Sequence, residues 1–405
     1  MHFLIFDCTS HLKRDILQPV PAQVYSYGWK INIQTRIKMK LHLPTGLLTV
    51  AISAMSLASA SDYYFTSNQK LGDLTDVGEI TILGSNVEVD SVNGGEGVML
   101  TCYSQREIDS PGGPAPEVVT DHPATFKVNS NLVLNYTYVR GIDSSNVVTI
   151  TADDIKSDSK LVIDYAKLQA LTGNVSIAGK LYDDGFISKS SVTNTDLIAE
   201  NGSVNIGAYL TMEGGTIAAA NDVNITNSTV TVNGLSAQNV NINEKGKLNI
   251  EDAGRVELGE VAVGAGASLG VNGATLVLNE GSSITLAEGA TLTAFDNVSL
   301  EFIMDADSAA EYSFDVFVGI DNLTDEASLA IIKEFEQALT AGDISISLKS
   351  MTADGELIEL DAASAEVTFT DGTLSIGGTL SVPEPTTATL SLLALAALAA
   401  RRRRH

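Results

Sequence analysis

Chemically versatile side chains are scarce in this sequence. Its 405 residues include 2 cysteines, 5 histidines and 1 tryptophan, and aromatic residues make up only 6%. The chain has no Cys-His zinc spacing, no G-x-S-x-G elbow, no Walker loop and no G-x-G-x-x-G before a helix. We therefore expect no metal site, no cofactor and no catalytic residue.

Basic residues are also few. The chain carries 24 Lys+Arg against 50 Asp+Glu, and residues 61–385 alone hold 14 basic and 48 acidic side chains. Phosphate binding needs a basic footprint, so a nucleic-acid partner is excluded. An acidic body of this kind would be soluble and would repel anionic polymers.

Residues 39–60, MKLHLPTGLLTVAISAMSLASA, have the layout of a secretory signal peptide. Lys40 gives a short basic start, an apolar uncharged stretch follows, and Ala58 and Ala60 form a small-x-small cleavage site. Signal peptides begin at the start codon, so we interpret Met39 as the true initiator.

Residues 1–38 would then be an over-called start, although a genuine N-terminal extension remains the alternative. Cleavage would leave a mature chain beginning near Ser61, with Cys102 as its only thiol. We interpret Cys102 as a small hydrophobe near a strand end rather than as a reactive group.

The last residues, 382–405, fall into three parts. A helix cannot run through Val382–Pro385, because its two prolines fix their own φ and push their neighbours to extended conformations. Residues 386–400 are uncharged and rich in Ala and Leu, so we expect a transmembrane helix. It would span about 22 Å, short of the ~30 Å hydrocarbon layer unless the bilayer thins and arginines snorkel. A basic cluster, expected on the cytoplasmic side, follows at Arg401, Arg402, Arg403 and Arg404.

This arrangement resembles the PEP-CTERM sorting signal, and the matching recognition residues are Val382, Pro383, Glu384 and Pro385. The resemblance implies processing by an exosortase, an integral-membrane Cys transpeptidase that removes the helix. It also implies that 386–400 enters the inner membrane only transiently. A plain, uncleaved C-terminal membrane anchor is the alternative.

The central region repeats a short phrase of alternating polar and apolar residues: Asn174–Ile177, Ser203–Ile206, Asp222–Ile225, Asn239–Ile242 and Lys247–Ile250. Such alternation is typical of half-buried strands. Turns rich in Gly, Asn and Asp separate units of about eight residues, which leaves no room for crossover helices.

Two or three such units per coil predict an all-β, right-handed parallel β-helix over residues 61–300. A β-sandwich is the competing architecture. At the level of pattern, the repeat resembles β-helical autotransporter passengers and polysaccharide-binding surface proteins.

Residues 301–381 predict a small α+β or β-rich cap that would shield the open end of the solenoid. Thr324 to Glu326 is a good helix start, and Gly342 can close that helix. Its buried face should carry Leu329, Ile332, Phe335 and Leu339. Strand-like stretches follow at Ile344–Leu348, Leu357–Leu360 and Val367–Thr370, with a hairpin turn at Asp371-Gly372.

These patterns indicate an exported, non-catalytic structural or adhesive protein of the cell envelope, cell surface or extracellular matrix. Its expected partners are the exosortase and an extracellular polysaccharide or glycan. The alternative is a β-helical polysaccharide lyase or glycosidase, whose candidate groups would be Lys245, Lys247, Arg255 and the acidic pairs Asp153-Asp154 and Asp183-Asp184. Adjacent side chains on a strand point opposite ways, so we interpret both acidic pairs as turn residues.

Overall fold

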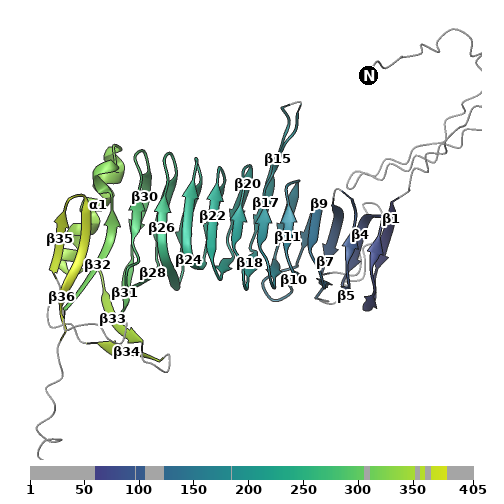
Figure 1. Ribbon diagram of the computed structural model, residues 1–405, viewed down its shortest axis with the longest axis horizontal. Helices are drawn as coiled ribbons and strands as arrows, with labels where there is room; N and C mark the ends of the chain where they lie inside the picture. The colour runs from purple at the N-terminus through teal and green to yellow at the C-terminus, as the bar shows by residue number, and fades with distance from the viewer. Residues whose placement is uncertain are drawn as a thin grey trace, which may run out of the picture. The chain divides into compact units, whose positions relative to one another are not determined.

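The structure is a computed structural model that describes residues 60–95, 97–104, 123–183, 185–304, 311–351, 356–360 and 366–380. Over these residues the chain forms a right-handed parallel β-solenoid of about 11 turns (Figure 1). Neighbouring coils pair in parallel along the solenoid. The predicted parallel β-helix is therefore confirmed, and the β-sandwich alternative does not apply.

The coil strands lie on three faces. Face A contains β1 (Ser61–Phe65), β4 (Val77–Leu83), β7 (Val98–Tyr103), the second half of β9 (Leu132–Arg140), β12 (Leu161–Asp164), β17 (Ser190–Thr193), β20 (Leu210–Glu213), β23 (Thr229–Val232), β25 (Lys247–Glu251), β27 (Ser268–Asn272) and β30 (Thr291–Asp296).

Face B contains β2 (Gln69–Leu71), β5 (Asn86–Val89), β8 (Thr125–Val128), β10 (Val148–Ala152), β13 (Ala166–Ala170), β18 (Asp196–Ala199), β21 (Thr216–Ala219), the first halves of β24 (Gly234–Asn243) and β26 (Arg255–Val263), β28 (Thr275–Asn279), β31 (Ser299–Met304) and β33 (Ile346–Met351).

Face C contains the first half of β9, β11 (Ile155–Ser157), β14 (Val175–Ile177), β19 (Val204–Ile206), β22 (Asp222–Thr226), the second halves of β24 and β26, β29 (Ile284–Leu286) and β32 (Glu311–Val318). Near the N-terminal end, β3 (Leu74–Thr75) and β6 (Val92–Asn93) form a separate parallel pair.

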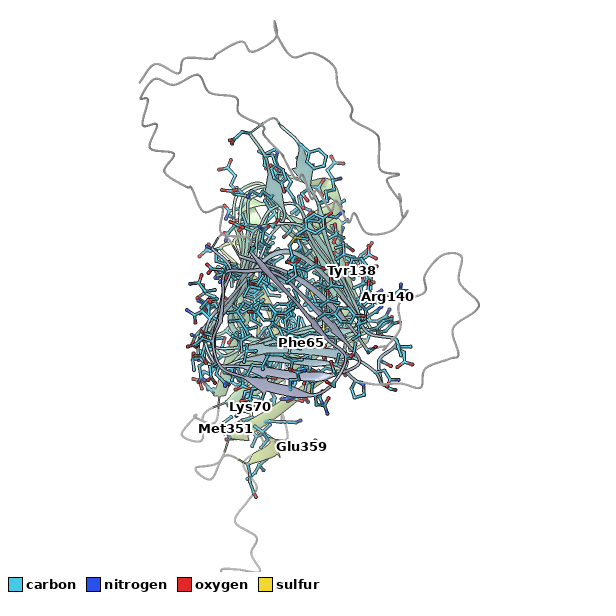
Figure 2. All side chains as sticks on the ribbon, turned by 90° about the vertical axis from the view of Figure 1, so that its right-hand side faces the viewer. Phe65, Lys70, Tyr138, Arg140, Met351 and Glu359 are labelled. Carbon is cyan, nitrogen blue, oxygen red and sulfur yellow. The ribbon has the colours of Figure 1, made fainter. Side chains whose placement is uncertain are left out.

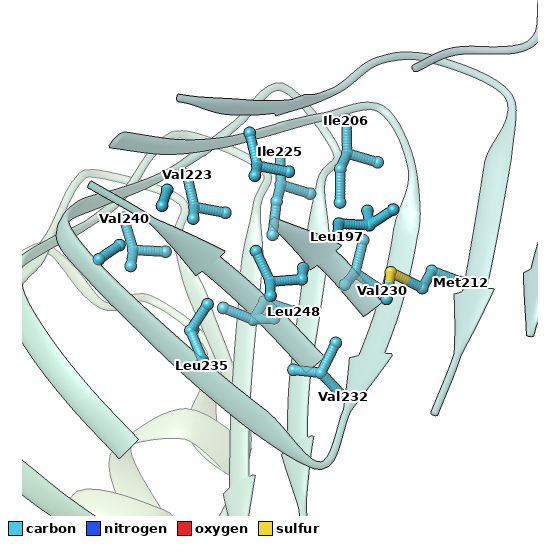
Figure 3. Packing of buried hydrophobic residues seen from close by; sticks show 14 of the residues in the cluster. Leu197, Ile206, Met212, Val223, Ile225, Val230, Val232, Leu235, Val240 and Leu248 are labelled. Carbon is cyan, nitrogen blue, oxygen red and sulfur yellow. The ribbon is translucent and has the colours of Figure 1, made fainter. Parts of the chain in front are cut away.

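Four of the five repeated phrases supply core residues of face C, and the fifth, Lys247–Ile250, lies in β25 on face A. In β22, Val223 and Ile225 are both 0% exposed, and they stack on Val240 and Ile242 of the next coil. The side chains of Val223, Ile225 and Val240 point into the space that the three faces enclose (Figure 3). Burying each such side chain contributes about 1.5–3 kcal/mol, and a β-branched residue suits the pleated strand.

The polar residue of the phrase does more than face water. Asn241 donates a side-chain hydrogen bond to Asn224 Oδ1 (2.9 Å), Asn224 donates to Asn205 Oδ1 (2.8 Å), and Asn205 donates to Ser176 Oγ (3.0 Å). A ladder of like side chains thus ties successive coils together on the outside of face C, in the way that stacked amides reinforce cross-β structure.

Tight corners join the faces. Asn194 and Asn227 adopt left-handed backbone conformations there (φ 46° and 48°), which Asn tolerates better than most residues. Gly215 has φ 81°, and a Cβ at this position would clash with the Thr195 carbonyl oxygen of the preceding coil. Glycine is required there both by φ and by the close approach of the two backbones.

The C-terminal end of face A is covered by α1 (Glu326–Ala341), which follows the short 3₁₀ helix η1 (Ile320–Asn322). Ser328 Oγ accepts from Leu292 N (2.9 Å), so it satisfies a backbone N–H of β30, the last strand of face A. Its single proton can be donated either to Asp325 Oδ2 (2.9 Å) or to Leu292 O (3.3 Å). Phe335 packs edge-on against Phe295, with 4.8 Å between ring centroids. Because it satisfies and covers this edge, α1 removes a template for strand addition.

The other two faces end in antiparallel strands. On face B the parallel pairing continues past residue 300 to β33, which then pairs antiparallel with β34 (Leu357–Leu360). On face C, β32 pairs antiparallel with β36 (Thr373–Thr379), which also pairs with β35 (Glu366–Thr370). Asp371 and Gly372, both at positive φ, form the turn between the last two strands, as the sequence predicts.

The helix itself differs from its prediction in one respect. Asp325 is the N-cap and accepts from Ser328 N (2.9 Å), and Gly342 closes the C-terminus at φ 78°. However, Leu329 is 41% exposed, while Ser328 is buried beside Ile332, Phe335 and Leu339. Residue 329 lies about 100° around the helix from 328, so placing Leu329 on the buried face was wrong.

We expect the stacked core to be intolerant of a cavity. Replacing Ile225 with Ala should destabilise the protein by about 2–5 kcal/mol, because lost burial and the resulting void add together. Thr211→Ala, on exposed face A, should change stability by less than about 0.5 kcal/mol. Guanidinium unfolding followed by far-UV circular dichroism measures both, and equal midpoints for the two variants would contradict the packing described.

Cys102 lies in β7 with 0% exposure, and burial raises the pKa of its thiol. In a Cys8→Ser background it should not react with a thiol reagent until the protein is unfolded, since the thiolate is the reactive species. Met99 lies on the same strand, and its side chain is 42% exposed. A cysteine introduced by Met99→Cys should therefore react at once in the folded protein. Rapid native labelling of Cys102 would show that β7 is not packed as described.

Candidate functional site

Exposed large apolar side chains gather on the coils between β1 and β9. They are Tyr64, Met99, Val133, Tyr136 and Tyr138. Tyr64 is 64% exposed and Tyr138 is 37% exposed, and both project from face A. A group of this kind on a soluble protein commonly marks a binding surface.

The strand register places these tyrosines in one line. Tyr64 is opposite Thr81, Thr81 is opposite Thr101, and Thr101 is opposite Tyr138. Neighbouring strands are ~4.8 Å apart, so the two tyrosines are separated by about 14 Å along the solenoid axis. The hydroxyl-bearing threonines lie between them.

Two further tyrosines border this line. The ring of Tyr103 lies 5.6 Å from that of Tyr138, and Tyr136 lies under the Lys160 ammonium group at 5.6 Å. Desolvation, together with Tyr138, raises the pKa of Tyr103 to about 12 despite the opposing effect of Arg140. The Tyr103 phenol therefore stays protonated at neutral pH and keeps its O–H as a donor.

We call this surface the tyrosine face, and define it by Tyr64, Tyr103, Tyr136, Tyr138, Arg140 and Lys160. Figure 2 shows Tyr138 and Arg140 projecting from the same side of the solenoid end. Arg140 is opposite Asp164 of the next coil, and Asp62 and Glu79 occupy exposed or half-buried positions nearby on face A. The surface thus offers aromatic planes, hydroxyls and charges of both signs, without a strong field of one sign.

A second polar surface lies on face B. A shallow depression of ≈ 410 Å³ is lined by residues that include Lys70, Glu88 and Lys127. Glu88 accepts from Asn129 (3.1 Å), Lys70 (3.2 Å) and Lys127 (3.3 Å), and these hydrogen bonds lower its pKa to about 2. The two lysines are therefore engaged with the same carboxylate, so this depression is a weaker candidate than the tyrosine face.

One basic residue that a lyase or glycosidase could use has a structural role. Arg255 binds Glu257 (2.5 Å) and the buried Glu301 (2.6 Å), which also pairs with Lys349 (2.7 Å). Glu301 is 6% exposed, so these partners compensate for its burial and join β26, β31 and β33. These ion pairs explain the presence of Arg255 by a structural role.

The other candidate groups are not brought together with Arg255. Asp154 accepts from Asn174 N (2.8 Å) in a corner, and Asp183 lies in an exposed turn. Lys245 has φ 41°, in the turn that leads into Lys247 at the start of β25. The described residues contain no group of three or more His, Cys, Asp or Glu positioned to hold a metal ion.

Sequence reasoning did not select the tyrosine face. The phrase Asn135-Tyr136-Thr137-Tyr138 does place tyrosines two apart, but only the register between coils aligns Tyr138 with Tyr64.

Of the sequence-predicted site residues, Ala60 is described, and it is exposed directly before β1. The remaining residues lie outside the described ones: Ala58, Val382, Pro383, Glu384, Pro385, Arg401, Arg402, Arg403 and Arg404, together with the predicted helix 386–400. Within the described ranges, none of the helices has the length and hydrophobicity needed to cross a membrane.

Comparisons with known proteins locate one family feature, at the C-terminus. The model of the PEP-CTERM protein-sorting motif matches residues 381–404. No curated protein and no solved structure matches the chain. The chain therefore carries a PEP-CTERM protein-sorting motif behind a parallel β-solenoid, which confirms the resemblance drawn from Val382 to Arg404.

Proposed function

We propose that this protein is a non-catalytic surface solenoid, exported through its sorting motif, that attaches to a neutral extracellular glycan through the tyrosine face. The sorting motif itself indicates export by way of an exosortase and a membrane-anchored precursor in the envelope. The attachment rests on one observation, the alignment of Tyr64 and Tyr138 on exposed face A.

The chemistry of the tyrosine face suits a sugar chain. Tyrosine presents an apolar ring with a polar tip, so it can pack on the C–H surface of a sugar and hydrogen-bond a hydroxyl. The ~14 Å line fits an extended oligosaccharide lying along the solenoid axis. The net charge of −26 disfavours an anionic polymer, which is why we propose a neutral glycan.

A binding role without turnover fits the surroundings of these residues. The tyrosine face is a strand surface rather than a cleft, and the Arg, Lys and Asp residues that a lyase or hydrolase would use are engaged elsewhere or lie apart. Glycosidases place two carboxyl groups at a fixed separation across the scissile bond. In this proposal the solenoid holds a polymer and does not change it.

The sorting motif also gives the topology of the precursor. Residues 386–400 would act as the membrane stop, with Arg401 to Arg404 in the cytoplasm and the solenoid outside. The exosortase would read Val382, Pro383, Glu384 and Pro385 and release the body into the envelope or matrix.

Sorting is tested by replacing Pro383, Glu384 and Pro385 together with Ala. The wild-type protein should lose the tail and leave the membrane fraction, whereas this variant should keep its full C-terminus and stay in the membrane. Intact-mass spectrometry of both fractions measures the outcome, and Arg404→Lys, which preserves the basic cluster, is the control. A wild-type protein that retains His405 would contradict processing.

Glycan attachment is tested with Tyr64→Ala and Tyr138→Ala. Each should weaken binding to neutral polysaccharide by about 10-fold, or ~1.4 kcal/mol, because a stacking surface is lost. Affinity electrophoresis against a panel of neutral and anionic polysaccharides measures binding, and a reducing-end assay measures turnover.

Phe369→Ala is the matched control, because Phe369 is a 50% exposed aromatic residue in β35, at the C-terminal end of the solenoid and outside the tyrosine face. Equal losses in all three variants, or release of reducing ends, would contradict the proposal.

A further inference from the structure

One coil carries an insertion that the solenoid does not need. Between β14 and β17 the chain leaves the coil to form a hairpin of β15 (Lys180–Leu181) and β16 (Ile187–Ser188). The hairpin projects beyond the corners of the neighbouring coils (Figure 1). The next coil makes the same turn from β19 to β20 between Ile206 and Leu210, so closing the coil does not require the hairpin.

Apolar side chains cover both sides of this hairpin. Leu181 is opposite Ile187, and Tyr182 N donates to Phe186 O (2.8 Å) with the two rings 5.9 Å apart. Successive strand residues point to opposite sides, so one side is aliphatic and the other aromatic. The exposed fractions are 52% for Leu181, 37% for Tyr182, 63% for Phe186 and 38% for Ile187. A two-stranded hairpin that is exposed to solvent on both sides is only marginally stable by itself. Its exposed apolar side chains therefore indicate that it binds a partner.

The charges on the hairpin discriminate between partners. Lys180 and Lys189 lie at its base and Asp183 lies at its exposed tip. A lipid bilayer would receive the acidic tip first and would meet unfavourable burial of a carboxylate. A second hairpin in antiparallel orientation would instead place its own basic base beside that acidic tip.

We propose that the hairpin, residues 180–189, is a contact between two copies of this protein, related by a two-fold axis. A two-fold contact uses the same patch on both copies, so each Asp183 faces the partner's basic base and the apolar side chains meet in the middle. Such a small patch gives a weak association, because stable interfaces bury at least ~1,000 Å². Confinement of many copies to one surface raises their effective concentration and makes weak contacts sufficient.

The test is a charge exchange in the full chain, purified in detergent. Asp183→Lys together with Asp184→Lys makes the hairpin entirely basic, and Lys180→Asp with Lys189→Asp makes it entirely acidic. Each variant alone should dissociate at least 10-fold more readily than wild type in sedimentation equilibrium, because like charges meet. A mixture of the two variants should form heterodimers with about wild-type affinity, because both tip-to-base contacts are restored.

A cysteine placed near the proposed axis gives a second readout. Ile187→Cys in a Cys8→Ser background should form an intermolecular disulfide under mild oxidation, whereas Thr368→Cys, exposed in β35 at the C-terminal end of the solenoid, should not. Circular dichroism verifies that every variant keeps the β-solenoid. A wild-type protein that stays monomeric to millimolar concentration, or a mixture without heterodimers, overturns the proposal.

Discussion

Parallel backbone pairing between successive coils is the interaction on which the rest of this structure depends. It fixes which residues of neighbouring coils lie opposite one another, so that Val223 stacks on Val240 and Ile225 on Ile242 inside, while Asn224 bonds Asn205 and Asn241 outside. The same register aligns Tyr64 with Tyr138 on face A. Core, ladder and candidate binding surface are consequences of one repeated pairing.

A stack of this kind needs an end, and the three faces end differently. Face A stops under α1, where Ser328 satisfies Leu292, and faces B and C turn to antiparallel pairing through β34 and β36. The buried Glu301, bound by Arg255 and Lys349, lies near this end and holds β26, β31 and β33 in place. Charged side chains in this acidic protein therefore act at the cap as structural cross-links, which accounts for one of its few arginines.

The sequence predicted local structure well because local structure depends on alternation and turns. The phrases ending at Ile177, Ile206, Ile225 and Ile242 are strands in face C, and Asp371-Gly372 is a hairpin turn.

The sequence did not predict the tyrosine face, because the sequence separation between opposed residues varies from coil to coil. Thr81 is opposite Thr101, but Thr101 is opposite Tyr138, at nearly twice the sequence separation. The sequence did not predict the asparagine ladder either, since a side-chain bond between coils requires their register. The tail was recognised from the order of its parts, which the motif at 381–404 confirms.

The central claim, that the solenoid is displayed outside the cytoplasm, is tested most directly by labelling intact cells. Lys70 and Lys127 have side chains that are 71% and 46% exposed, so a membrane-impermeant, amine-reactive biotin reagent can reach them wherever the solenoid faces the medium. The account predicts biotin on peptides containing these lysines from intact cells, with cytosolic marker proteins unlabelled. Labelling of these peptides only after lysis would contradict it.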